Sequence, residues 1–256
     1  HWPDSMFTYL GQDKVLFSQD AFGMHLASSE RFADEIDEGV LDYEAAKYYA
    51  NILLLYSPLV LKLFDKMTGL DLDIQVIAPD HGPIYREGLD WILSRWARWA
   101  AQKPTNKAVV VYDTMWGSTA KMAQAIGDGL AAGGARVKQM QLRACHRSDI
   151  ATEVLDAGAL LIGSPTINGE MFPTVADILT YMRGLKRQNL IGQAFGSYGW
   201  SKKIVDQLTD WLASMKVELV GDPVNVQYVP DDDALAQCYS LGRLVAERLN
   251  ERCEAE

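Results

Sequence analysis

AVVVYDTMWGST, residues 108–119, joins an apolar run of strand length to a polar loop and then to the start of a helical pattern. The run Ala108 to Tyr112 has the nearly continuous aliphatic character of a strand buried on both faces of a parallel sheet. An amphipathic stretch, Ser118 to Ala132, follows directly after the loop. A strand that leads into a helix is the first half of a βαβ unit, so this stretch predicts an α/β fold.

The same alternation continues toward the C-terminus. Because parallel strands need crossover helices between them, the repeated alternation predicts a doubly wound parallel sheet covered on both faces. The expected strands are Ala108–Tyr112, Val137–Leu142, Ala159–Gly163 and Gln193–Ser197, and the expected helices are Ser118–Ala132, Pro173–Gly184, Ser201–Met215 and Asp232–Leu249.

The first hundred residues have a different pattern. A long helical segment from Tyr43 to about Gly69 is followed by a short strand, Ile74 to Ala78. A further helix is expected from about Gly88 to Ala101. One or two strands do not make a stable sheet alone, so this part of the chain is predicted to be an incomplete α/β domain.

The domain boundary is expected at QKPTN, residues 102–106, a polar string that contains proline. It separates a Trp-rich helical pattern from the apolar run at 108–112. We therefore predict one domain over residues 1–102 and a second over residues 103–256.

Charge and composition argue against several function classes. The formal net charge of −10 lacks the basic footprint of a nucleic-acid-binding protein. The most apolar run, Ile52 to Phe64, contains Pro58 and is shorter than the roughly 20 residues of a membrane-spanning helix, so no membrane anchor is expected. Cys145, Cys238 and Cys253 are odd in number and widely spaced. Free thiols and the absence of an export signal predict a cytoplasmic location.

The loop from Thr114 to Thr119 lies at the carboxyl end of a predicted parallel strand, where open α/β sheets bind ligands. Hydroxyl groups and free N–H groups at a helix start can surround a phosphate, and Gly117 lets the backbone come close. Neither GxxxxGK[ST] nor GxGxxG occurs here, so a monophosphate fits better than a triphosphate or a dinucleotide. Taken alone, the loop is equally consistent with an ordinary capped helix.

Two more loops follow the third and fourth predicted strands: GSPTING at residues 163–169 and GSYGW at residues 196–200. Together the three loops resemble the phosphate loop and the two ring-binding loops of flavodoxins, and the resemblance covers the whole second domain. It implies noncovalent FMN. The residues implied to bind it are Thr114, Met115, Trp116, Gly117, Ser118, Thr119, Pro165, Thr166, Ile167, Asn168, Gly169, Ser197, Tyr198, Gly199 and Trp200. For Tyr198 and Trp200 the alternative is ordinary packing at a sheet end.

His1, Asp20 and His81 are candidate metal ligands in the first domain. Imidazole and carboxylate groups suit iron, and a carboxylate can bridge two ions, but by residue type alone a structural or surface role is more common. The separations of 19 positions (20 − 1) and 61 positions (81 − 20), with the strings around them, match the second half of the metal motif of flavodiiron proteins. The whole chain thus resembles the C-terminal portion of that family.

The flavodiiron resemblance implies that residues 1–102 are the C-terminal part of a metallo-β-lactamase-like domain that holds two non-haem iron ions. His1 and His81 would each bind one iron, and Asp20 would bridge both. The family's other ligands, two His with a Glu and an Asp in the string HxExDH, do not occur in residues 1–256. The resemblance therefore implies that this other ligand cluster, the first in the family's motif, is supplied from outside this chain.

The implied function is that of an oxidoreductase. Electrons would pass from a rubredoxin-type donor through FMN to the diiron centre, which reduces dioxygen to water, nitric oxide to nitrous oxide, or both. The resemblance further implies a head-to-tail homodimer or homotetramer. Two alternatives stay open: an FMN-binding electron-transfer module without a working metal site, and a flavin-dependent quinone or nitro reductase without metal.

Overall fold

The computed structural model describes residues 4–255, and the chain divides into two compact units, residues 1–102 and 103–256. The division falls between Gln102 and Lys103, inside the predicted linker string. Each unit has a sheet of its own. Within residues 4–255, no helix combines the length and the apolar character that crossing a bilayer requires.

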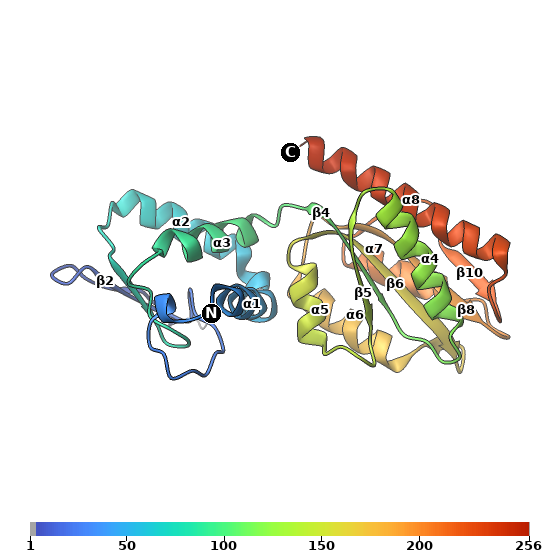
Figure 1. Ribbon diagram of the computed structural model, residues 1–256, viewed down its shortest axis with the longest axis horizontal. Coiled ribbons are helices and arrows are strands. Elements are labelled where there is room, and N and C mark those ends of the chain that lie inside the picture. The colour runs from blue at the N-terminus through green and yellow to red at the C-terminus, as the bar shows by residue number, and fades with distance from the viewer. Residues whose placement is uncertain (1–3, 256) are drawn as a thin grey trace. The chain divides into compact units, whose positions relative to one another are not determined.

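The second unit is built on a parallel sheet with the strand order β5-β4-β6-β8-β10 (Figure 1). Two short strands are added: β7 pairs with β6 antiparallel, and β9 pairs with β8 parallel. The chain reverses its direction of travel across the sheet between β4 and β6, and such a switch point is where doubly wound sheets bind ligands. The strands are β4 Thr105–Tyr112, β5 Arg136–Gln141, β6 Ala157–Ile167, β7 Glu170–Met171, β8 Ile191–Tyr198, β9 Glu218–Leu219 and β10 Val224–Gln227.

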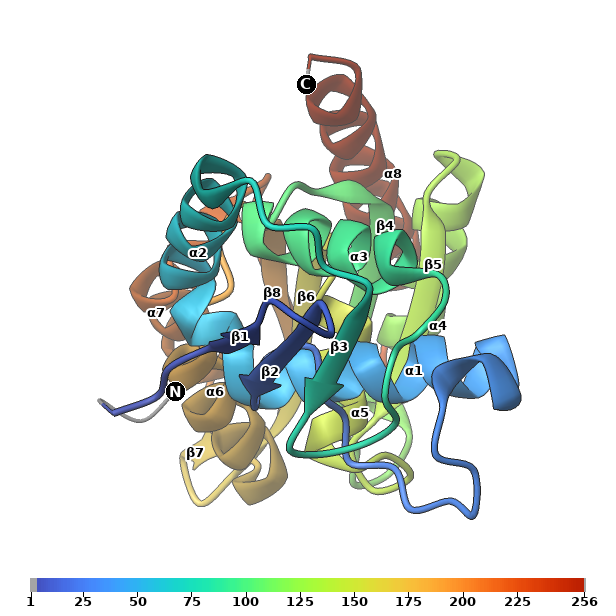
Figure 2. The same ribbon diagram turned by 90° about the vertical axis from the view of Figure 1, so that its left-hand side faces the viewer.

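Helices cover both faces of this sheet. On one face α4 and α8 lie side by side over a core of aliphatic residues, and α6 and α7 lie on the opposite face (Figures 1 and 2). The helices of this unit are α4 Ser118–Ala132, α5 Arg147–Val154, α6 Pro173–Leu185, α7 Ile204–Ser214 and α8 Asp232–Ala255. The predicted doubly wound parallel sheet is confirmed.

The first unit has a three-stranded sheet, β1-β2-β3, in which β1 and β2 form an antiparallel hairpin and β2 pairs with β3 in parallel (Figure 2). Helices α2 and α3 pack against each other beside it. Phe22 and Trp96 are fully buried and their rings lie 4.8 Å apart, which places the core of this unit between the sheet and the helices. The elements are β1 Thr8–Leu10, β2 Val15–Gln19, β3 Val76–Pro79, α1 Glu38–Tyr48, α2 Ser57–Leu70 and α3 Leu89–Ala101.

The helical segment predicted from Tyr43 to about Gly69 is helical throughout, but it is not one regular α-helix. The chain enters α1 at Glu38, where the Asp37 carboxylate caps the helix, and α1 ends at Tyr48. A π-helical turn and a 3-10 turn then occupy residues 49–56 before α2 begins. Pro58 accounts for the irregularity directly before α2, because proline has no N–H to donate within a helix and is best tolerated in the first turn, where it lies in α2.

Candidate functional site

The three loops predicted to bind flavin come together at the carboxyl edge of the second unit's sheet. Tyr112, the last residue of β4, is paired with Gly163 of β6, and Pro165 of β6 is paired with Ser197 of β8. The loops that follow these positions therefore start from neighbouring strands. The structure brings together the sites of all three predicted loops.

The first loop is held in shape by two hydrogen bonds of Thr114. Its N–H donates to the Asp113 carboxylate at 2.8 Å, and its hydroxyl accepts from the Gly117 N–H at 3.0 Å. Gly117 has φ +90°, and a Cβ at this position would meet nothing within 4 Å. Helix α4 begins at the next residue, Ser118, and the first N–H groups of a helix have no partner inside it. The loop and the start of α4 therefore offer backbone N–H donors of the kind that bind an anion.

The side chain of Thr119 makes a contact that the sequence did not predict. It is fully buried, and its hydroxyl is hydrogen bonded to the Ser197 hydroxyl at 2.9 Å. This bond ties the first loop to the third. Thr119 therefore joins two loops through its side chain, while its backbone N–H is among the first in α4, which have no partner inside the helix.

The second loop is a short hairpin between β6 and β7. Thr166 is paired with Met171, and the turn contains two consecutive residues with positive φ, Asn168 at 51° and Gly169 at 80°. Such a turn matches the twist of a tight hairpin. The Thr166 hydroxyl donates to the carbonyl of Ser201 at 3.3 Å, which joins the hairpin to the third loop.

Large aromatic side chains stand exposed at the same edge. Trp116 in the first loop is 89% exposed and Trp200 in the third is 97% exposed, whereas Tyr198 is half-buried. Exposure this large at two tryptophans is uncommon, because indole rings are mostly buried. Anion-binding donors and free aromatic faces at one strand edge are the two features that a phosphorylated, planar cofactor requires. The residues therefore fit FMN.

In the first unit the structure brings Asp20 and His81 together. His81 Nε2 lies 3.2 Å from Asp20 Oδ1, and their side chains are 49% and 18% exposed. Gly23 allows this approach, since a Cβ there would fall 2.8 Å from the His81 carbonyl oxygen. The third predicted ligand, His1, lies outside the described residues.

Two further polar rings surround this pair, and the sequence patterns did not assign them. The imidazole of His25 lies with its centroid 5.6 Å from that of His81 and 4.7 Å from the ring of Tyr48. Burial, the charge of Asp20 and a hydrogen bond to it raise the pKa of Tyr48, so the phenol keeps its proton. Among residues 4–255, no group of three or more His, Cys, Asp or Glu residues is placed to hold a metal. The described donors thus fit a share of a metal site and not a complete one.

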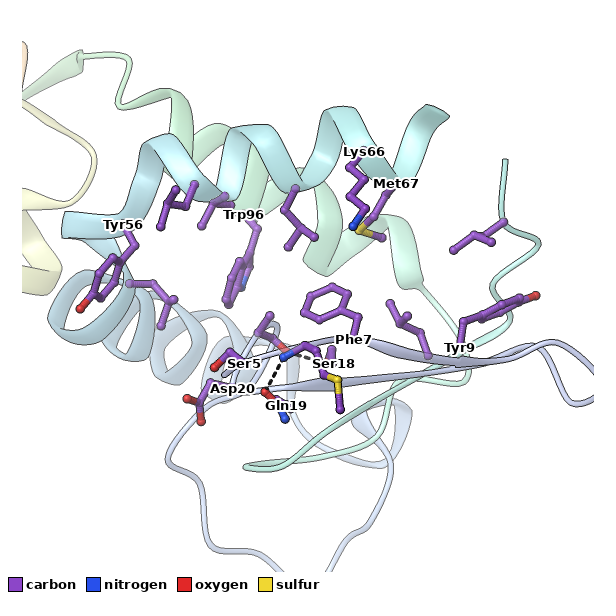
Figure 3. Close-up of a pocket in the computed structure, with 18 of the residues that line it drawn as sticks. Ser5, Phe7, Tyr9, Ser18, Gln19, Asp20, Tyr56, Lys66, Met67 and Trp96 are labelled. Carbon is purple, nitrogen blue, oxygen red and sulfur yellow. Dashed lines mark hydrogen bonds between the residues drawn. The ribbon is translucent and has the colours of Figure 1, made fainter. Parts of the chain in front are cut away.

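A cavity of about 530 Å³ lies in the first unit between the β1–β2 hairpin and helices α2 and α3 (Figure 3). Its lining is mostly aliphatic and aromatic, with Phe7 and Trp96 facing it and Asp20 at one end. The buried Nε1 of Trp96 has no hydrogen-bond partner among the described residues. The sequence patterns missed this cavity because they did not predict β1 and β2. Its lining resembles an apolar packing face rather than a site with converging catalytic groups.

Comparison with known proteins gives consistent results. The flavodoxin family model matches residues 110–242 and indicates FMN as the cofactor. The chain is 47% identical to a protein named nitric oxide reductase from Moorella thermoacetica over 250 residues, 97% of this chain and 63% of that protein. Among solved structures it is similar to rubredoxin oxygen:oxidoreductase from Desulfovibrio gigas, with a TM-score of 0.95 and 42% identity over 98% of this chain and 63% of that one.

A second solved structure, a flavodiiron protein from Giardia intestinalis, has a TM-score of 0.92 and 32% identity over 100% of this chain and 63% of that one. The chain therefore spans less than two thirds of the length of these relatives. The likeness runs through both units and confirms the predicted fold class. The homologues that match nearly the whole chain are flavodiiron proteins. Because the family model matches residues 110–242, the chain belongs to the flavodoxin family.

Proposed function

We propose that residues 103–256 bind FMN and that the chain is the flavin-bearing portion of an oxidoreductase that reduces dioxygen, nitric oxide or both. The observation that supports this most is the meeting of three loops at the switch point of the parallel sheet, with helix N-terminal donors and exposed Trp116 and Trp200 at one edge. FMN supplies the exchange of single electrons between a donor and a metal centre.

The chain's own residues would divide the work of holding FMN. The N–H groups at the start of α4 would bind the phosphate, since the positive end of the helix dipole faces them. The hairpin at residues 165–169 and the segment 197–200 would contact the ring system. The bonds Thr119–Ser197 and Thr166–Ser201 hold these segments together before any ligand binds, which lowers the entropic cost of binding.

We further propose that residues 1–102 are the C-terminal part of a metallo-β-lactamase-like domain and that His1, Asp20 and His81 supply part of a diiron site. The short distance between Asp20 and His81 supports this proposal. The remaining ligands would come from a segment outside these 256 residues. In the assembly, a head-to-tail homodimer or homotetramer would bring the flavin of one subunit to the metal of another. The electron donor would be a rubredoxin-type protein in the cytoplasm.

Electron transfer from the donor tests the proposed function. The 256-residue chain loaded with FMN should lose the visible absorption of oxidised flavin when it is mixed with a reduced rubredoxin in the absence of oxygen. Zinc-substituted rubredoxin, in which a redox-inactive metal holds the same fold and surface, is the matched control and should leave the absorption unchanged. Reduction by dithionite but not by rubredoxin would contradict the donor assignment.

One observation favours the alternative of an electron-transfer module. Because the described residues place only two metal-type donors together, the chain on its own could serve as an electron-transfer module without a working metal site. Comparing the full chain with residues 103–256 in the same mixing experiment separates a docking role of the first unit from a metal-binding role. Equal reduction rates would show that the first unit is not needed to receive electrons.

A further inference from the structure

Asp113 is a buried carboxylate that neither the flavin-binding prediction nor the proposed function uses. It follows the last residue of β4 and is 0% exposed. It is located directly before the loop whose N–H groups would bind phosphate. A negative charge close to an anion site weakens anion binding by Coulomb repulsion. A carboxylate at this position must therefore make favourable contacts that exceed this repulsion.

The structure shows these contacts of Asp113. One carboxylate oxygen, Oδ1, accepts the Thr114 N–H at 2.8 Å and lies 3.3 Å from Nε of Arg143. The other, Oδ2, accepts the hydroxyl of Thr174 at 2.6 Å. Thr174 belongs to the first turn of α6, the helix that follows the ring-binding hairpin. The single side chain thus joins the first loop to the start of α6.

Arg143 offsets the charge of this buried group. Its guanidinium lies against Asp113 and 5.4 Å from the centroid of the Phe172 ring, while its side chain remains 53% exposed. A hydrogen bond to a charged acceptor is about twice as strong as a neutral one. Asp113 can therefore fix the direction of the first peptide of the loop more firmly than a neutral side chain would.

We propose that Asp113 is a positioning residue for the cofactor phosphate: by accepting the Thr114 N–H and the Thr174 hydroxyl, it sets the loop in the shape that points its remaining N–H groups at the phosphate. This rests on the proposed FMN function. The consequence is selective. Loss of Asp113 should weaken the binding of a flavin that carries a phosphate more than one that lacks it, because the ring contacts come from other loops.

The test measures the dissociation constants of FMN and riboflavin for the full chain and its variants by quenching of flavin fluorescence. Asp113→Ala should weaken FMN about tenfold and riboflavin less than about threefold, the size expected from losing a charge-assisted bond. Asp113→Asn keeps an oxygen that can accept the Thr114 N–H and should lose less. Thr174→Val should weaken FMN, and in combination with Asp113→Ala it should add little further loss.

Asp177→Asn is the matched control. Asp177 lies in α6 one turn after Thr174, but its side chain is exposed and pairs with Arg147. The substitution should leave both constants unchanged. Unchanged FMN binding in Asp113→Ala, or an equal loss for FMN and riboflavin, would overturn the positioning role while leaving the FMN function standing. An unmodified chain that binds FMN no better than riboflavin would overturn both proposals.

Discussion

Replacing Asp20 by Ala in a protein that carries the complete set of flavodiiron ligands is expected to abolish the reduction of dioxygen and nitric oxide while leaving the flavin spectrum intact. Asp20 lies 3.2 Å from His81 in the first unit, whereas the flavin loops belong to the second. Changes beside metal ligands alone cost roughly 10–100-fold in metal affinity or activity, so loss of the proposed bridging ligand should cost more than about 100-fold.

The measurement is iron per flavin together with the consumption of each gas. Asp73→Ala is a suitable control, because Asp73 is an exposed acid of the same unit that pairs with Lys14 and not with a proposed ligand. Residues 1–256 without the added ligands should bind FMN fully, hold iron weakly and reduce neither gas at a useful rate. Two tightly bound irons and full turnover from residues 1–256 alone would show that the missing ligand cluster is not needed.

Replacing Gly117 by Pro is expected to weaken FMN by at least about 100-fold. Proline fixes φ near −65°, whereas Gly117 has φ +90°. Proline also removes the N–H that donates to the Thr114 hydroxyl. The loop would lose both the backbone turn and one of the two hydrogen bonds that hold its shape. Because each tenfold change in affinity corresponds to only about 1.4 kcal/mol, the loss of both features is enough for the expected weakening.

Gly134 provides a closely matched control at the other end of α4. It has φ +89°, a Cβ there would also meet nothing within 4 Å, and its N–H donates to the Ala131 carbonyl at 2.9 Å. Gly134→Pro should therefore lower stability by a similar mechanism without selective loss of FMN. Thermal unfolding of the flavin-free variants and FMN titration separate the two effects. Equal loss of FMN affinity in both variants would mean that Gly117 matters only for stability.

The regular elements of the second unit could be predicted from the sequence because their signals are local. The run at residues 108–112 and the helix Ser118–Ala132 follow from aliphatic and helical periodicity, and the structure has α4 with those bounds. Strand β10, Val224–Gln227, was missed because a four-residue edge strand in which only Val224 is buried carries little hydrophobic signal. Helix α5, Arg147–Val154, was missed because it is short and mostly polar.

The long-range contacts of the candidate site could not be predicted in the same way. The bond between Thr119 and Ser197 joins residues 78 positions apart, and that between Asp113 and Thr174 joins residues 61 positions apart. The periodicity of side chains in a single sequence gives no information about contacts over such long separations. His25 likewise comes to lie beside His81 only because the fold brings β2 and β3 together. Loop positions were therefore predictable, and the bonds between loops were not.

Titration of the unmodified 256-residue chain with FMN, riboflavin and FAD tests most directly whether the three loops form a flavin site with a phosphate loop. We expect one FMN per chain and a clearly weaker affinity for riboflavin, because riboflavin lacks the phosphate that the N–H groups at the start of α4 would bind. Equal affinity for FMN and riboflavin, or preference for FAD, would contradict that site.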